Sequence, residues 1–391
     1  MYVTRPLSLY RKHPSALAAE PPEGPFTGYL VITDDEAEAD DTYCFGACKR
    51  RRVKKLPFPQ DKILNVVHSS DYQDTVIANK LWFLPVLDLP LSSNCYYVIK
   101  AKGRFKGQAC ICSGDMDMGL CCFKKVINDR KPKPLDPRNI NQKFKIHRHY
   151  GHSFFAKSIA PYGHPPKLLR NRGWEVKTSR LSKCNFQISE ALGLDASLRT
   201  QLPSFDFPIS TKKSPSVLVG TWYCPFVFIR ENARIREQMR RSMLYKMTLE
   251  QHWEEIYTWE NVNNNENSMI VIVNANVERE VDYVFGREGR KDVKVNDGGF
   301  IWYRGGRGLN VGLSYAIVEK MKMVEEEGGW VDDVNERNVR IERRVHITSE
   351  NGWRKLSCFV LVETFVLRRM DGTLVLKCDF RHTHQIKSKC E

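Results

Sequence analysis

The chain has 391 residues and a formal net charge of +15, and 42% of its residues are hydrophobic and 11% aromatic. This composition is that of a globular protein and excludes an intrinsically disordered chain. No apolar run approaches the roughly 20 residues that span a bilayer, and no apolar segment of a secretory signal follows Met1. We therefore expect a protein of the cytoplasm, the nucleus or both, without a transmembrane segment.

The excess of basic residues favours an acidic partner, which could be nucleic acid, an anionic membrane or an acidic protein face. A protein partner is our first expectation and nucleic acid the alternative. The 12 cysteines, in a chain without a secretory signal, are interpreted as reduced thiols.

The N-terminal part alternates short strands with charged segments. Strands are predicted at 28–33, 81–86 and 96–100, and the acidic run at 34–41 is predicted as a solvated loop. A basic run follows, with the composition of a nuclear localisation signal or of a phosphate-binding patch; it contains Lys49, Arg50, Arg51, Arg52, Lys54 and Lys55. The alternative is that the acidic and basic runs pair with each other.

A proline-rich stretch divides the chain. Residues 128–137 contain three prolines, which resist regular structure. We predict an N-terminal lobe at 1–127, a linker at 128–140 and a C-terminal lobe at 141–391. The segments LPVLDLPLSS (84–93) and LPSFDFPIST (202–211) resemble each other, so two related lobes are a further hypothesis.

The stretch from 217 to 261 has the clearest local patterns. An apolar strand at 217–231 precedes a helix with Ile235 and Met239 on one face and four basic residues outside it: Arg234, Arg236, Arg240 and Arg241. Thr248-Leu249-Glu250-Gln251 is a capping box and predicts a second helix, with Leu249, Trp253 and Ile256 on one side.

The C-terminal third predicts antiparallel strands. Residues 271–285 and 339–347 alternate apolar and polar side chains, and Asp371-Gly372 predicts a hairpin turn. A helix is expected at 313–327, ended by Gly328-Gly329. Together these patterns predict an α+β fold of mixed, largely antiparallel sheets with a few amphipathic helices.

Several groups of cysteines and histidines are candidates for metal sites. Cys44 and Cys48, Cys110 and Cys112, and the pair Cys121-Cys122 lack the C-x₂-C spacing typical of zinc sites, so core thiols are favoured. His382 and His384 would share one face of a strand, but few carboxylates lie near them in sequence. We predict no metal and no cofactor.

Motifs of known enzymes are not found: the chain has no G-x-S-x-G elbow, no phosphate-binding P-loop and no H-E-x-x-H. The function we predict is a non-enzymatic binding or interaction module, with no catalytic residues, which uses the basic run and the basic helix. The alternatives are nonspecific nucleic-acid binding through these basic surfaces, and an enzyme whose site is assembled from scattered residues.

Several stretches resemble a plant-specific family, the domain of unknown function 1262. They include PPEGPFTGYLVITDDEAE, CFGACK, LPLSSNCYYVIKAKG, VGTWYCPFVFIRE and MRRSMLYKMTLEQHWEEIY, and they are spread over essentially the whole chain. The resemblance implies a plant origin and a single conserved unit. It implies no activity, cofactor or site residue.

Overall fold

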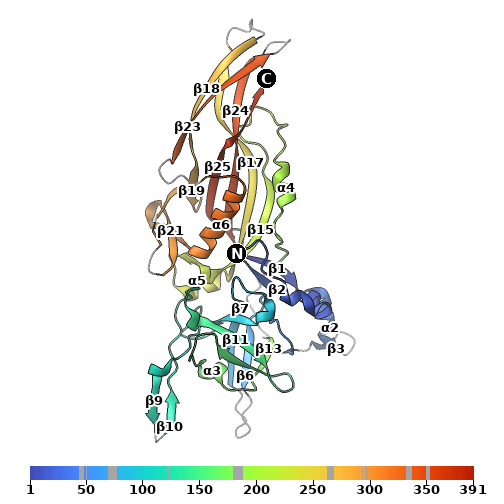
Figure 1. Ribbon diagram of the computed structural model, residues 1–391, viewed down its shortest axis with the longest axis vertical. Helices are drawn as coiled ribbons and strands as arrows, with labels where there is room; N and C mark the ends of the chain where they lie inside the picture. The colour runs from blue at the N-terminus through green and yellow to red at the C-terminus, as the bar shows by residue number, and fades with distance from the viewer. Residues whose placement is uncertain are drawn as a thin grey trace. The chain divides into compact units, whose positions relative to one another are not determined.

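The computed structural model describes residues 1–43, 48–49, 51–68, 77–121, 124–178, 188–261, 268–292, 294–295, 298–331, 337–348 and 353–391 (Figure 1). The chain forms two compact units that interleave along the sequence. Unit 1 comprises Met1–Ala191, Trp222–Tyr245 and Asn296–Phe300, and unit 2 comprises Leu192–Thr221, Lys246–Val295 and Ile301–Glu391.

Unit 1 is built on a sheet with the strand order β12-β11-β8-β7-β6-β13-β5. These strands are β5 (Arg52–Val53), β6 (Leu64–His68), β7 (Ile77–Pro85), β8 (Cys95–Lys100), β11 (Lys143–Arg148), β12 (Phe154–Ser158) and β13 (Glu175–Thr178). Alternate side chains on one face, such as Phe83, Tyr96 and Phe144, form a core with Phe58 and Trp174. The opposite face of β11 and β12 carries polar and aromatic side chains.

The remaining elements of unit 1 are short. β1 (Tyr2–Pro6) and β2 (Gly28–Ile32) pair in parallel, α1 (Leu7–Lys12) follows β1, and η1 (Pro14–Ala18) follows α1. They are accompanied by β3 (Thr42–Tyr43), β4 (Cys48–Lys49), η2 (Leu91–Ser93), η3 (Asp115–Asp117), β9 (Met118–Cys121), β10 (Lys124–Ile127), η4 (Ile140–Gln142), α3 (Lys167–Arg170), η5 (Phe226–Phe228), β16 (Ile229–Glu231) and α5 (Ile235–Arg241). The basic helix predicted after the strand at 217–231 is confirmed as α5.

The acidic run is not a loop, because it forms the helix α2 (Asp35–Asp40). Its first turn holds Asp35, Glu36 and Glu38, and carboxylates in that position interact favourably with the helix dipole. Ala37 turns inward and is fully buried, which anchors the helix.

Unit 2 has a long, mainly antiparallel sheet in the order β22-β21-β20-β19-β25-β24-β17. The strands are β17 (Leu244–Glu260, of which the first two residues belong to unit 1), β19 (Glu280–Val284), β20 (Arg287–Lys291), β21 (Phe300–Gly305), β22 (Asn310–Ser314), β24 (Lys355–Arg369) and β25 (Leu374–Cys390). β14 (Gly193–Leu194) pairs with β15 (Val217–Pro225), and η6 (Gly306–Gly308) joins β21 to β22.

A two-stranded ribbon, β18 (Ser268–Glu278) with β23 (Asn338–Thr348), packs on this sheet. Its inward side chains, among them Val271 and Ile341, contact Tyr257 of β17. The alternation predicted at 339–347 is thus confirmed as β23, whereas the strand predicted at 271–285 divides at Arg279 into β18 and β19.

Two helices of unit 2 position the side chains discussed below. α4 (Ala196–Gln201) begins at Asp195, whose Oδ1 accepts a hydrogen bond from the Leu198 amide at 2.9 Å. α6 (Tyr315–Glu327) buries Ile317, Met321 and Val324 and ends at Gly328, as the sequence predicts.

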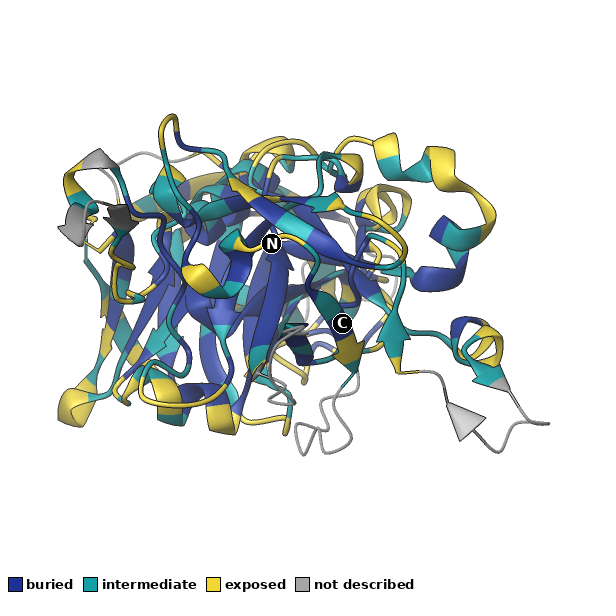
Figure 2. Cartoon of the chain, turned by 90° about the horizontal axis from the view of Figure 1, so that it is seen from below, coloured by how far each residue is buried: buried dark blue, intermediate teal, exposed yellow. Residues whose placement is uncertain are grey.

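The predicted α+β class is wrong, because the protein is mostly β, with 47% of the described residues in strands and 18% in helices. The second helix predicted from the capping box is part of strand β17. Leu249, Trp253 and Ile256 fit a helical period, but Met247, Leu249, Gln251 and Trp253 also alternate, and all four are buried. Figure 2 shows buried residues along the strands and exposed residues at turns.

Candidate functional site

Two groups of charged side chains stand out, one in each unit. The first is a cavity of about 480 Å³ in unit 1, which we call the cationic cavity. Six basic side chains line it: Arg11, Arg51, Arg52, Lys54, Lys55 and Lys62. Two carboxylates, Asp40 and Asp41, also line it, and both lie beside Arg11. Most of the remaining wall is apolar and includes Leu7, Tyr10, Leu17, Leu56 and Pro57.

The wall of the cationic cavity is assembled by short elements. α1 turns Leu7 and Tyr10 inward, and both are buried. The chain leaves β5 at Val53 and bends at residues 55–57 before the second proline at 59, and the two prolines exclude a helix here. This irregular stretch brings Lys54 and Lys55 to the lining of the cavity.

Half of these cations already have carboxylate partners. Arg11 Nη2 lies 2.9 Å from Asp41 Oδ2, Lys62 Nζ lies 3.2 Å from Glu38 Oε1, and Arg52 Nη2 lies 2.6 Å from Glu175 Oε1. Among the residues that the structure describes, no carboxylate pairs with Arg51, Lys54 or Lys55. Partial burial and the nearby charges of Lys54 and Arg52 lower the pKa of His152, which indicates a positive potential here.

The structure thus brings four residues of the predicted basic run, Arg51, Arg52, Lys54 and Lys55, to one cavity. Arg50 and the side chain of Lys49 lie outside the described residues. The four arginines of the basic helix lie elsewhere. Arg234, Arg236, Arg240 and Arg241 are all exposed at α5, and none of them lines the cavity.

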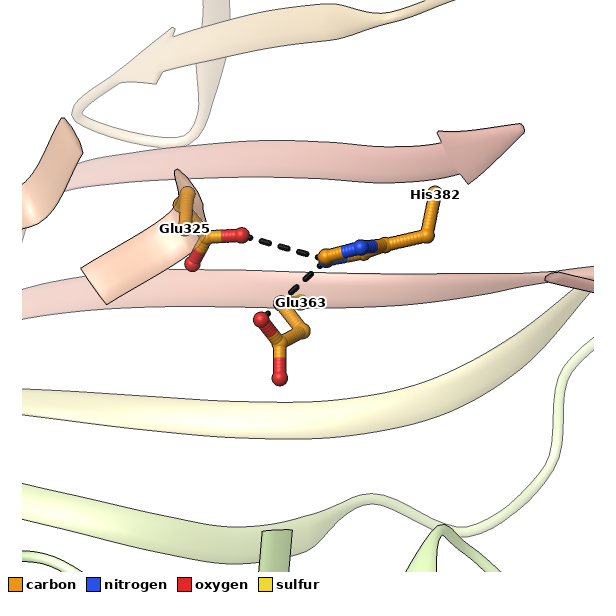
Figure 3. A group of neighbouring side chains, drawn as sticks. All are labelled: Glu325, Glu363 and His382. Carbon is orange, nitrogen blue, oxygen red and sulfur yellow. Dashed lines mark hydrogen bonds and ion pairs between the residues drawn. The ribbon is translucent and has the colours of Figure 1, made fainter. Parts of the chain in front are cut away.

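The second group is buried in unit 2 and was not predicted. We call it the charge quartet: Arg199 of α4, Glu325 of α6, Glu363 of β24 and His382 of β25. His382 Nε2 lies 3.2 Å from Glu325 Oε2 and 3.1 Å from Glu363 Oε2 (Figure 3). Arg199 donates to both oxygens of Glu363, with Nε at 2.8 Å from Oε1.

Strand register explains how the quartet forms. Glu363 is opposite Phe380 and Leu361 is opposite His382, so Glu363 and His382 are diagonal neighbours on one face of the β24–β25 pair. Gln251 of β17 adds a hydrogen bond from Nε2 to Glu363 Oε1 at 2.7 Å.

Each ionisable group in the quartet is shifted by its neighbours. Burial and the Glu363 charge raise the pKa of Glu325 to about 8. Burial alone would lower the pKa of His382, but its hydrogen bonds to Glu325 and Glu363 outweigh this effect and raise it to about 9. Burial opposes ionisation of Glu363 too, yet hydrogen bonds from His382 and Arg199 hold its pKa well below the usual range.

One histidine and two glutamates with ligand atoms within 4.8 Å of one another could hold a metal ion. However, Arg199 already occupies both oxygens of Glu363. A divalent ion here would also lie close to the buried Arg199 guanidinium, and like charges repel strongly in a buried site. The donor set therefore suits a hydrogen-bonded ion network better than a metal centre.

The predicted cysteine and histidine groups are placed as follows. Cys110 and Cys112 are buried, and burial raises their pKa values to about 12 and about 11, so both are protonated core thiols. Cys44, Cys122 and the side chains of Cys48 and Cys121 lie outside the described residues. His384 lies beside His382, with ring centroids 5.6 Å apart, and contributes no ligand atom to the quartet.

Comparisons with known proteins give one family match. Residues 23–123 match the family described as "Protein of unknown function (DUF1262)". A search of curated proteins returned no match. The chain is similar to a solved structure titled "Crystal structure of Cry35Ab1", with 10% identity, a TM-score of 0.45, and 85% of this chain and 90% of that chain covered. Within the described part of the chain, no helix is long and apolar enough to cross a membrane.

Proposed function

We propose that the protein is a binding module whose cationic cavity takes an organic anion, and that Arg51, Lys54 and Lys55 hold the negative group. The observation that carries this proposal is that three cations without a carboxylate partner among the described residues line one cavity. Lys and Arg side chains that are not neutralised within the protein raise the local concentration of anions.

The form of the cavity suggests the class of ligand. Its volume of about 480 Å³ lies within the roughly 300–1,000 Å³ of pockets that bind small molecules. Leu7, Leu17 and Leu56 line the same cavity and offer apolar surface. A carboxylate or phosphate joined to an apolar body matches both parts. Such a group could belong to a small molecule or to a side chain of a partner protein.

Titration with anilinonaphthalene sulfonate, an aromatic sulfonate that fluoresces when bound, tests the proposal. The variant Arg51→Gln/Lys54→Gln/Lys55→Gln should bind the probe roughly tenfold or more weakly, because the charge-assisted contacts are lost. N-phenyl-1-naphthylamine, which lacks the sulfonate, should bind both proteins equally. Displacement by phenyl phosphate and by a short acidic peptide would then separate the two sources of the ligand.

The matched control is Arg236→Gln/Arg240→Gln/Arg241→Gln on α5, which removes the same charge from exposed positions of the same unit. It should bind the sulfonate like the unaltered chain. Equal binding by all three proteins, or equal loss in the two triple variants, would refute a site at the cavity.

The motifs quoted above support a wider proposal: the whole chain is one unit of this family, of plant origin, and acts in the cytoplasm or nucleus. The basic run would serve there both as the cavity wall and as a nuclear signal. Imaging of a fluorescent fusion of the full chain, with and without the Arg51/Lys54/Lys55 substitutions, tests the nuclear role.

A further inference from the structure

One sheet face of unit 1 carries an arrangement that the cationic cavity does not use. Five side chains form it, which we call the aromatic–basic face: Lys145 and His147 of β11, Phe155 and Lys157 of β12, and Arg172. The other face of the same strands is buried, because Phe144, Ile146, Phe154 and Ala156 belong to the core. The aromatic–basic face is therefore the outward side of β11 and β12.

Two lysines oppose each other on this face. Lys145 pairs directly with Lys157 across the antiparallel strands, and both side chains are exposed. Like charges in directly opposed positions destabilise a sheet. Among the described residues, no carboxylate pairs with either lysine, and burial together with these two charges lowers the pKa of His147. This repulsion is relieved when an anion binds between the lysines.

The next pair along the strands is aromatic. His147 opposes Phe155, and their rings are stacked with centroids 4.9 Å apart and an interplanar angle of 14°. Arg172 Cζ lies 5.4 Å from the centroid of the Phe155 ring. Tyr150, in the connection between the two strands, is 88% exposed, and its ring centroid lies 5.1 Å from that of His149. Flat rings thus lie directly beside unneutralised cations.

We propose that the aromatic–basic face binds single-stranded nucleic acid. Phosphates would lie between Lys145 and Lys157, and unpaired bases would stack on His147 and Tyr150. Proteins that bind single strands without sequence preference combine these two features, aromatic side chains for the bases and cations for the backbone. Neither contact requires the 2′-hydroxyl, so RNA and DNA bind alike.

Fluorescence polarisation of labelled oligo-dT and oligo-U of twelve nucleotides with the full chain tests this site. Both should bind, and affinity should fall steeply with added salt as cations replace lysine contacts. Lys145→Glu/Lys157→Glu should weaken binding roughly tenfold or more through loss of phosphate contacts. His147→Leu, which keeps a side chain of similar size but removes the ring, should weaken binding of the oligonucleotides. It should leave the weaker binding of polyphosphate unchanged.

Two controls separate this site from other basic surfaces. Arg236→Glu/Arg240→Glu changes the net charge equally and should bind oligonucleotides like the unaltered chain. The cavity variant Arg51→Gln/Lys54→Gln/Lys55→Gln should also retain binding, so the two proposals can fail separately. The inference is overturned if neither oligonucleotide binds at low salt, if the α5 control loses as much affinity as the lysine variant, or if His147→Leu changes nothing.

Discussion

The charge quartet of unit 2 and the cationic cavity of unit 1 both gather charged side chains, but they differ in how the charges are balanced. In the quartet, Arg199 and His382 face Glu363 and Glu325 at hydrogen-bonding distance, and Glu325, Glu363 and His382 are almost fully buried. In the cavity, Arg51, Lys54 and Lys55 are unpaired among the described residues and reach solvent. The paired charges of the quartet therefore bear on stability, whereas the unpaired cations of the cavity are the basis of the proposed anion site.

The largest effect should come from Glu363→Gln. The change leaves Arg199 buried without its carboxylate, and breaking a buried pair in this way costs about 3–5 kcal/mol of the free energy of unfolding. Urea denaturation of the variant and of the parent protein measures this loss in the free energy of unfolding. The control Glu342→Gln removes an exposed carboxylate that lies 2.8 Å from Arg340, and it should cost less than about 1 kcal/mol. Similar losses in the two variants would contradict a stabilising quartet.

A smaller loss is expected from Gly328→Ala, which changes no charge. Its backbone φ of −78° suits alanine, but the added Cβ would overlap the Arg199 guanidinium, which Glu363 holds in place. Overpacking of this kind costs about 1–3 kcal/mol. Gly306→Ala is the control, because a Cβ there meets no atom within 4 Å. Thermal denaturation compares the midpoints of the two variants. An unchanged midpoint in Gly328→Ala would show that Arg199 is free to move.

The quartet should also make stability depend on pH. The folded pKa values of His382 and Glu325, about 9 and about 8, lie above those of the unfolded chain, so the folded state binds more protons. The His382 contribution is complete only below about pH 6.5 and the Glu325 contribution only below about pH 4.3, so stability falls as the pH rises, by about 2 kcal/mol or more between pH 6.5 and pH 8.5. Glu363 has the opposite sign, since its pKa is lowered, and its contribution is lost on acidification. Urea denaturation of the parent and of His382→Gln across this range should show a flatter profile for the variant; identical slopes would exclude His382 as the cause.

The smallest effect on stability should come from the cavity. Arg51→Gln/Lys54→Gln/Lys55→Gln removes side chains that have no carboxylate partner among the described residues, so the free energy of unfolding should change by less than about 0.5 kcal/mol. The same urea titration measures it. A slight gain in stability would strengthen the comparison, because it would show that these charges repel one another in the absence of a ligand. A loss of several kcal/mol would instead assign them a structural role.

The fold was predictable where the determinants are local. Gly328-Gly329 ends α6, and Asp371-Gly372 turns β24 into β25. β17 was misassigned because the spacing of Leu249, Trp253 and Ile256 is compatible with both helix and strand. In the strand the polar residue Gln251 is buried, because its Nε2 donates hydrogen bonds to Glu363 and to the Arg199 carbonyl. These partners lie far from Gln251 in the sequence, so the local pattern could not reveal them.

The cationic cavity and the charge quartet also differ in how far they could be predicted from the sequence. Four residues that line the cationic cavity stand almost side by side in the sequence, so their grouping could be predicted from the basic run. The quartet draws one residue from each of four elements between Arg199 and His382, and no spacing connects them. His382 was noted in the sequence, but its partners Glu325 and Glu363 could be found only from the register of β24 with β25 and the position of α6.

The interleaving of the two units has a consequence for synthesis on the ribosome. A nascent chain that has emerged as far as Ala191 still lacks Trp222–Tyr245, which contributes α5 and buried Phe226 and Phe228 to unit 1. At about 5–20 residues per second, roughly 50 further residues take several seconds. During that delay Phe226 is not yet available to stack on Trp82, whose ring centroid lies 6.2 Å away in the finished protein, so part of the apolar core of unit 1 stays exposed while the chain is made.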